Sequence, residues 1–214
     1  VPSPLSAYGA SKAAGDTAAQ TTRKHYVVRT SWVFGQGANF VAAMAGLARA
    51  GKQANVIMDQ RGRPTWAEDL AKGIAHLLAA GPERAPYGVY NLTSDGDTAS
   101  RDEVAMAVFV AAGGDPASVH PVTTERYREL AGPEAPRPTE STLALDKIKA
   151  TGFSPTNWRA ALALYLAQRY LSEGLHWTLP TMLLGFGGLL LLAPLAVLPW
   201  AVKLVKIVIM IAAK

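Results

Sequence analysis

The sequence predicts an α/β fold, and three features of the chain support this class. Segments with apolar residues at helical spacing alternate with short apolar runs that are typical of buried strands. Half of the 214 residues are hydrophobic, which is enough for a substantial core. One strand-like run leads directly into a polar and aromatic stretch, and open α/β sheets bind their ligands at such strand ends.

The first two predicted elements are a helix and the strand that follows it. Ser6 is a candidate N-cap, and the Ala-rich stretch after it predicts a helix that continues to about His25. A buried strand with a polar and aromatic end is then predicted by the run Tyr26-Val27-Val28-Arg29-Thr30-Ser31-Trp32-Val33-Phe34-Gly35.

The later elements follow from the same periodicities. Apolar positions at helical spacing predict helices over 39–51, 66–80, 145–150 and 158–171, a helix with apolar positions over 104–110, and a short helix from residue 124. Ser100, Asp102 and Glu103 are expected to cap the helix that contains 104–110. Short apolar runs predict strands over 56–58, 87–92 and 119–123. Residues 60–65 are polar and contain Gly and Pro, so we expect a loop with positioned hydrogen-bond donors there.

The net charge of +5 is distributed unevenly along the chain. Three of the 21 basic residues and none of the 16 acidic residues lie from Gly174 onward, so 18 basic residues face 16 acidic ones in the rest. This near-neutral body predicts no nucleic-acid partner. The chain has no cysteine, which excludes disulfides and thiolate metal sites and fits a cytoplasmic enzyme. The four histidines lie far apart without metal-ligand spacing, so no metal site is predicted.

Tyr8 and Lys12 are the candidate catalytic residues. Residues four apart lie on one face of a helix, so the phenol and the ammonium can point into the same space. A phenol has an ordinary pKa of about 10, and a fixed cation nearby lowers it. The pair could then give a proton to a carbonyl oxygen as hydride reaches its carbon. The bare spacing also occurs by chance on surface helices, and it is the strand after this helix that favours the catalytic interpretation.

Several further motifs occur in one order over residues 1 to about 170. They are Tyr8-Gly9-Ala10-Ser11-Lys12, Arg29-Thr30-Ser31-Trp32-Val33-Phe34-Gly35, Asp59-Gln60-Arg61-Gly62-Arg63-Pro64-Thr65, Pro136-Arg137-Pro138 with Ser141 and Leu143, and Trp158 with Ala161-Leu162. In these motifs the chain resembles the extended short-chain dehydrogenases/reductases, and within them the dTDP-4-dehydrorhamnose reductase family.

The resemblance implies an oxidoreductase that uses NADPH or NADH. Its reaction would reduce the 4-keto group of a dTDP-linked 6-deoxysugar, dTDP-4-dehydrorhamnose, to give dTDP-L-rhamnose. Tyr8 would donate the proton, and Lys12 would lower the pKa of Tyr8 while bonding the nicotinamide ribose. Thr30 and Ser31 would lie near the nicotinamide at the end of the strand.

The resemblance also implies four substrate contacts. Trp32 would form an apolar wall against the deoxysugar, and Gln60 and Thr65 would donate or accept hydrogen bonds in the sugar-nucleotide site. Without the resemblance, the 60–65 segment would be read as a simple strand-to-helix turn. Arg137 would bind the diphosphate through its forked guanidinium, and the alternative is a solvated arginine in a Pro-rich loop.

By resemblance, residues 1–171 form the C-terminal half of a Rossmann-type short-chain reductase with its small substrate-binding subdomain. The Gly-rich phosphate turn of a full reductase is not found in the chain, because Gly35-Gln36-Gly37 lacks a third glycine and the preceding βαβ position. The third catalytic residue, a Ser or Thr on an earlier strand, is not found either. We therefore expect a chain truncated at its N-terminus that is inactive alone.

Residues 172–214 form an apolar tail that departs from the family. The 24 residues 179–202 carry no charge, and a segment of this length is long enough for a membrane-spanning helix. Tryptophans and lysines lie near its ends, as residues that anchor a helix at the membrane interface would. Three prolines and four glycines argue against one straight helix. A membrane anchor with contact through 179–213, a fusion remnant and an artefact of a truncated gene remain open. The lysines after the span favour a cytoplasmic C-terminus. A single span would then place the reductase body on the other side of the membrane, and only a re-entrant hairpin would keep both in the cytoplasm.

Two rival functions and several further partners stay open at this point. Another extended reductase or epimerase would share Tyr8 and Lys12 but act on a different nucleotide sugar. A noncatalytic, sugar-nucleotide-binding protein associated with the membrane would explain the tail and the missing half. The expected partner is a dTDP-sugar, a homodimer is compatible with the sequence, and the expected location is the cytoplasm, with membrane association through the tail left open.

Overall fold

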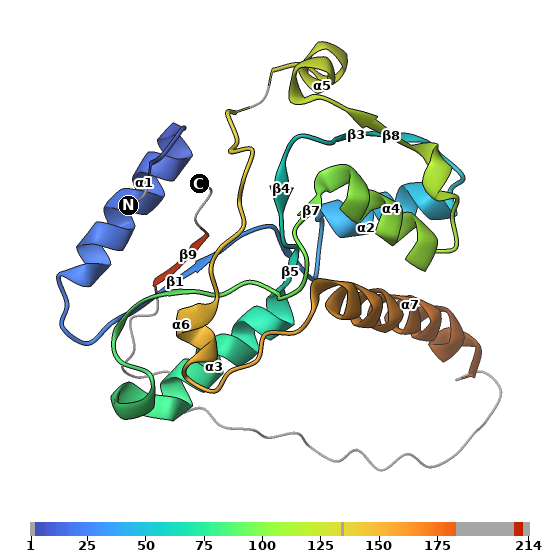
Figure 1. Ribbon diagram of the computed structural model, residues 1–214. Coiled ribbons are helices and arrows are strands. Elements are labelled where there is room, and N and C mark those ends of the chain that lie inside the picture. Colours follow the sequence, from blue (N-terminus) through green and yellow to red (C-terminus); the bar gives the residue numbers. More distant parts are fainter. Residues whose placement is uncertain (1–2, 134, 183–207, 212–214) are drawn as a thin grey trace.

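Helices and strands alternate along the chain in the computed structural model, which describes residues 3–133, 135–182 and 208–211 (Figure 1). The elements are α1 (Ala7–Gln20), β1 (Tyr26–Thr30), β2 (Val33–Phe34), α2 (Phe40–Arg49), β3 (Ala54–Ile57), β4 (Arg61–Gly62), β5 (Thr65–Trp66), α3 (Ala67–Arg84), β6 (Gly88–Asn91), β7 (Ala99–Ser100), α4 (Arg101–Ala111), a 3-10 turn (Pro116–Ser118), β8 (Val119–Val122), α5 (Thr124–Ala131), α6 (Asp146–Lys149), α7 (Trp158–Met182) and β9 (Val208–Ile211). The predicted α/β class is confirmed.

Strand β1 is the centre of a parallel sheet in the described part of the chain. It pairs with β6 on one side and with β9 on the other, so that Val28 lies opposite both Tyr90 and Ile209. Val27 and Val28 are buried, as expected for a parallel strand that is covered on both faces. The polar residues that follow β1 therefore leave the sheet at its carboxyl edge.

Three short strand pairs extend away from this sheet. Strands β2 and β5 pair in parallel, as do β3 and β8, whereas β4 and β7 are antiparallel. The β4–β7 pair joins Gly62 to Ala99. These pairings bring the residues after β3 close to the start of α4, and both regions contribute to the site described below.

Among the described residues, the largest side chain that is fully buried is that of Trp158, at the start of α7. Its indole lies in a cluster with residues of α2, α4 and the β2–β5 pair, and its Nε1 donates a hydrogen bond of 3.0 Å to the Asp97 carbonyl. Two further clusters lie around Tyr90 and Ile148, and around Phe109 and Val56. Full burial of an aromatic or aliphatic side chain contributes about 1.5–3 kcal/mol each, so these clusters hold the fold together.

Most predicted elements are found with shifted ends, and the end of the first helix was predicted wrongly. Helix α1 stops at Gln20 rather than near His25. Two β-branched residues, Thr21 and Thr22, follow it, and the Thr21 hydroxyl donates to the Ala18 carbonyl, which competes with continued helical bonding. At the other end of the chain, α7 continues past residue 171 to Met182, so the domain boundary proposed there stays a prediction.

The expected loop at 60–65 contains two short strands. Arg61 and Gly62 pair with β7, and Thr65 begins β5, which leaves Arg63 and Pro64 as the connection. The loop that the polar composition predicted over 60–65 is therefore found at Arg63 and Pro64, between the two strands. The flanking residues are extended because they have partner strands far away in the sequence, which a local pattern cannot reveal.

The predicted membrane segment lies mostly on residues 183–207, outside the described part of the chain. Among the described residues, no helix combines the length and the apolar character that crossing a bilayer requires. The membrane contact proposed from the sequence therefore stays a prediction.

Candidate functional site

A cavity of about 480 Å³ is lined by residues that follow β1 and β3, by the start of α4 and by the start of α1. Segments far apart in the sequence supply its walls. The lining residues are Ser6, Tyr8, Ser31, Trp32, Val33, Phe34, Phe40, Val41, Gln60, Pro64, Arg101, Val104, Ala135, Pro136, Arg137, Pro138 and Ser141. Five of the eight residues predicted for the site are among them, and Lys12, Thr30 and Thr65 are not.

Tyr8 reaches the cavity from the first turn of α1. Ser6 caps this helix as predicted, because its side chain accepts a hydrogen bond of 3.2 Å from the Gly9 N–H. The Lys12 Nζ lies 5.4 Å from the centre of the Tyr8 ring, so the predicted pair shares one helical face. Tyr8 is 47% exposed, and a bound molecule could reach its hydroxyl from the cavity side.

An ion pair attaches α1 to β1. Asp16 accepts hydrogen bonds from Arg29 Nε at 2.9 Å and Nη2 at 2.5 Å, and the Asp16 side chain is only 6% exposed. Gln20 donates a third bond to the same carboxylate at 3.0 Å. Asp16 and Gly9 are the buried residues of α1. The orientation of Tyr8 and Lys12 therefore depends on a polar contact that sequence reasoning missed.

Thr30 and Ser31 follow at the carboxyl end of β1. Both are buried, and the hydroxyl oxygen of each has no hydrogen-bond partner among the described residues. Ser31 lines the cavity, whereas Thr30 is not among the lining residues. Buried hydroxyls are normally bonded, so this pair has hydrogen-bonding capacity that a cofactor or substrate could use.

Trp32 takes a strained backbone conformation at the edge of the cavity. Its φ of 49° makes it the one non-glycine residue with positive φ in the described part of the chain. Such a conformation costs about 1–3 kcal/mol and is typical of functional sites. The Trp32 carbonyl accepts a hydrogen bond of 3.1 Å from the Thr65 N–H, which ties the strained residue to β5.

Gln60 is 2% exposed and presents an acceptor at the cavity wall. Thr124 uses its hydroxyl proton to bond Asp59 at 2.6 Å, so its oxygen can only accept from Gln60, whose Nε2 lies 3.3 Å away. The amide is thereby oriented with Oε1 free of a donor among the described residues. Burial raises the pKa of Asp59, but the hydrogen bonds from Thr124 outweigh it and hold that pKa below its ordinary value.

The two remaining predicted substrate residues differ in position. Arg137 lines the cavity from the extended Pro-rich segment and is exposed, which suits a residue that meets an anionic ligand. Thr65 is buried in β5, where its hydroxyl donates to the Arg63 carbonyl and accepts from the Ser94 N–H, both at 3.4 Å. Its direct contact with a ligand stays a prediction, and its bonds support the wall from behind.

Arg101 lines the cavity and was missed from the sequence. It is the first residue of α4, and its Cζ lies 5.1 Å from the centre of the Trp32 ring. A cation in the first turn opposes the helix dipole, which favours negative charge there. This mismatch, directly after the predicted cap at Ser100, is the signal that could have revealed a functional arginine.

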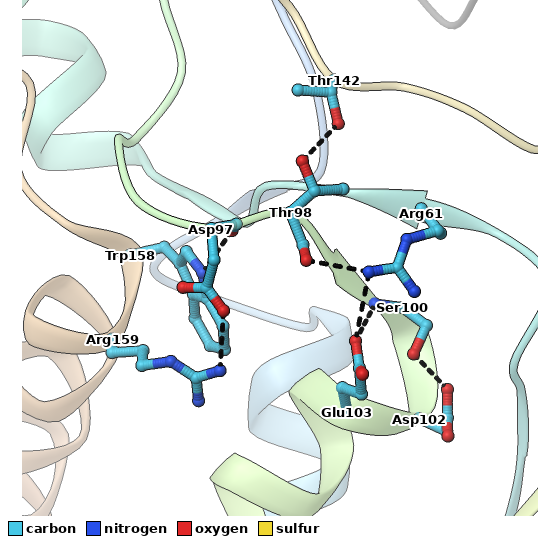
Figure 2. Close-up of polar contacts among 9 residues, drawn as sticks. All are labelled: Arg61, Asp97, Thr98, Ser100, Asp102, Glu103, Thr142, Trp158 and Arg159. Atoms are coloured by element: carbon cyan, nitrogen blue, oxygen red, sulfur yellow. Dashed lines mark hydrogen bonds and ion pairs between the residues drawn. The ribbon is translucent and has the colours of Figure 1, made fainter.

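A polar network fixes the start of α4 (Figure 2). The Glu103 carboxylate accepts from the Ser100 N–H at 2.7 Å, and this backbone bond, against the opposing effect of burial, lowers the pKa of Glu103. Arg61 lies between this carboxylate and the Thr98 carbonyl, to which it donates at 3.0 Å. Asp97 bonds Arg159 on the adjacent helix α7. The predicted cap is thus present and connects α4 to its neighbours.

Metal-ligand chemistry is not supported by the residues that the structure describes. No group of three His, Asp or Glu side chains comes together among them in a way that could hold an ion.

Comparisons with known proteins place this geometry in a family. The family described as "RmlD substrate binding domain" matches residues 1–171. A dTDP-4-dehydrorhamnose reductase of Streptomyces griseus is 41% identical over 164 residues, which cover 74% of this chain and 52% of the relative. The spore coat polysaccharide biosynthesis protein SpsK of Bacillus subtilis is 37% identical over 168 residues, covering 78% of this chain and 56% of the relative.

A solved structure shares the fold. The dTDP-4-dehydrorhamnose reductase of Bacillus anthracis, determined in complex with NADP, is 32% identical with a TM-score of 0.70, covering 78% of this chain and 57% of that one. The present chain spans about half the length of the curated relatives that it matches. With the match over 1–171 and the agreement in fold, the chain belongs to the RmlD substrate binding domain family of the extended short-chain reductases.

Proposed function

We propose that this chain forms the substrate-binding and proton-donating part of an NAD(P)H-dependent reductase. Its substrate would be a dTDP-linked 4-keto-6-deoxysugar, dTDP-4-dehydrorhamnose, and its product dTDP-L-rhamnose. The observation that carries the proposal is the convergence of Tyr8, Ser31, Trp32, Gln60 and Arg137 on one cavity from four separate segments. The family membership and the names of the relatives support the same reaction class.

The residues present fit a nicotinamide cofactor on one side of this cavity. The buried Ser31 hydroxyl lines the cavity, and that of the preceding Thr30 lies outside the lining. The described residues use the hydrogen-bonding capacity of neither. Lys12 lies one turn from Tyr8 and could bond the ribose, as predicted from the resemblance. When bound, the cofactor supplies the hydride.

The proposed chemistry of the chain is a single proton transfer. As hydride reaches the C4 carbon, the C4–O double bond opens and its oxygen takes the proton from the Tyr8 hydroxyl, which leaves a hydroxyl on the sugar. The Lys12 ammonium beside the Tyr8 ring stabilises the negative charge that remains. Tyr8 is reprotonated from solvent, to which it is open.

Substrate binding is assigned to three other residues of the lining. Arg137 would bind the diphosphate, Trp32 would contact the apolar side of the deoxysugar, and Gln60 would accept a hydrogen bond from a ligand hydroxyl or ring N–H. Thr65 is proposed to support Trp32 and, as predicted, to contribute to the sugar-nucleotide site. The proposed domain division places these functions in residues 1–171, apart from the tail at 172–214.

The direct test uses the complete reading frame that contains this chain. The purified protein is given dTDP-4-dehydrorhamnose with NADPH or NADH, and oxidation of the cofactor is followed together with the sugar product. Stoichiometric formation of dTDP-L-rhamnose is expected. Reduction of a different nucleotide sugar would assign the chain to another reductase, and ligand binding without turnover would support a noncatalytic protein.

The remaining predictions concern where the protein works. A cytoplasmic location, a homodimer and membrane contact through 179–213 stay proposals. Fractionation of cells and light scattering of the purified protein test them independently of the reaction.

A further inference from the structure

Gly62 lies in β4 against the indole of Trp32. An alanine at position 62 would place its Cβ 2.9 Å from Trp32 Cε2 and 3.1 Å from both Cδ2 and Cζ2. The 2.9 Å distance is shorter than real Cβ contacts and the 3.1 Å distances are tight, so either the indole or the strand would have to move. Gly62 has no positive φ, unlike the glycines of the turns. Its backbone could therefore accept alanine, and the missing side chain is required by Trp32 rather than by the local conformation.

Arg101 approaches the same indole from the start of α4. Its Cζ lies 5.1 Å from the centre of the Trp32 ring and 6.0 Å from that of Phe40, within the range of cation–π contact. The Arg101 N–H donates to the Gln60 carbonyl at 3.2 Å, which fixes the position of the helix start. A planar guanidinium stacks on an aromatic face, whereas the ammonium of lysine is a point charge on a flexible stem.

The Trp32 backbone is held as firmly as its side chain. The residue has a φ of 49° in the left-handed region, and its carbonyl is bonded by the Thr65 N–H. A bulky residue keeps such a conformation only when its surroundings impose it. Backbone, steric and electrostatic contacts therefore act on one side chain at the edge of the cavity.

We propose that Gly62 and Arg101 are positioning residues that hold the Trp32 indole as a fixed wall, so that the cavity selects the sugar half of its ligand. Gly62 provides the space for the ring, and Arg101 restricts its rotation. The selectivity rests on the proposed function, because it assumes that the ligand is a nucleotide sugar. The placement of the ring is independent of that assumption and has its own measurement.

The role of Gly62 is tested most directly by Gly62→Ala, with Gly46→Ala as a matched control. Gly46 is helical, does not line the cavity and has open space where its Cβ would lie, so its substitution should leave ligand binding unchanged while the helix gains slightly in stability. Binding of dTDP-glucose and of dTDP is measured by calorimetry for each protein. Gly62→Ala is expected to weaken dTDP-glucose by about tenfold and dTDP by less than twofold, because a misplaced group in a pocket costs roughly that factor.

Arg101 is tested by a conservative and a non-conservative variant. Arg101→Met removes the cation but keeps a long side chain, and Arg101→Lys keeps the charge. We expect Arg101→Met to show the same selective loss as Gly62→Ala and Arg101→Lys to restore part of it. The double variant Gly62→Ala with Trp32→Leu removes the steric conflict, so adding Gly62→Ala to Trp32→Leu should change nothing further.

Fluorescence separates failure of this inference from failure of the proposed function. The Trp32 emission is obtained as the difference between wild type and Trp32→Phe, and again in the Gly62→Ala background. A changed difference spectrum with Gly62→Ala shows that the ring has moved, even if no dTDP compound binds the wild type, in which case the proposed function fails alone. Unchanged emission, or equal loss of dTDP-glucose and dTDP, would overturn the inference.

Discussion

Helix α1 and the region around α2 and α4 both contribute residues to one cavity but are attached in different ways. Helix α1 lies beside β1, apart from the group of helices at the right of the view (Figure 1). It buries only Gly9 and Asp16, whereas α4 buries Val104, Val108 and Phe109 among others. The proposed proton donor is thus held by a polar contact and the ligand wall by a packed core. Substitutions in the packed core should therefore lower the stability of the whole fold, whereas loss of the polar contact should loosen α1 alone.

The largest effect on stability is expected at the core. Trp158→Ala should lower the free energy of unfolding by about 3–5 kcal/mol, because a fully buried aromatic side chain is replaced by a cavity. The hydrogen bond to Asp97 is lost as well. Urea unfolding followed by circular dichroism measures the change, and Trp158→Phe should recover part of it. A loss below about 1 kcal/mol would show that this core does not dominate stability.

The next largest effect is expected at the α1 contact. Asp16→Ala leaves Arg29 without its buried partner and should cost about 2–3 kcal/mol, below the range for fully buried pairs because Arg29 is partly exposed. The loss should be local, so hydrogen exchange of α1 amides should accelerate while that of α4 amides does not. Glu125→Gln, on the exposed face of α5, is the control. Equal acceleration in both helices would contradict the separation of the two regions.

Local and distant contacts explain how much of this could be predicted from sequence. The Ser6 cap, the Glu103 cap and the shared face of Tyr8 and Lys12 depend on residues within four positions, and all three are found. The α/β class follows from periodicity and is also found. The contact of Arg101 with Trp32 joins residues 69 positions apart, so no local pattern could reveal it.

The position of Thr65 shows the same limit. Its ligand contact stays a prediction, whereas its burial beside Ser94 follows from the pairing of β5 with β2, which no local pattern reveals. The Asp16–Arg29 pair was missed for a related reason. Both residues look like ordinary surface charges until the helix is placed against the strand.

A smaller effect is expected at the hydrogen bonds that orient Gln60. Thr124→Val removes the acceptor for Gln60 Nε2 and should weaken binding of a dTDP-sugar by about fivefold, the equivalent of one hydrogen bond of about 1 kcal/mol. Thr124→Ser keeps the hydroxyl and is the control. If dTDP alone is weakened equally, the donor belongs to the base, and if only the sugar nucleotide is weakened, it belongs to the sugar. No change in either would show that Gln60 needs no such support.

The smallest effect is expected in the pH dependence of stability that two ion pairs, Lys149–Asp95 and Arg159–Asp97, produce. Hydrogen bonds from Lys149 to Asp95 and from Arg159 to Asp97 lower the pKa of each carboxyl below its ordinary value of 3.8, although burial opposes them. Because the folded pKa is the lower one, the stabilisation is complete above 3.8 and is lost as pH falls through the lowered values. Thermal melts of wild type and Lys149→Met should therefore converge in acid. A constant difference at every pH would refute this assignment.

The most direct measurement is the activity of Tyr8→Phe in the complete protein, with Tyr127→Phe as the control on α5 away from the cavity. The substitution removes one hydroxyl from an exposed position and should leave stability and dTDP-sugar binding unchanged. Reduction of dTDP-4-dehydrorhamnose should fall by at least about 100-fold, the usual contribution of a positioned proton donor. Undiminished reduction in Tyr8→Phe would contradict the assignment of the proton donor, and with it the account of this cavity.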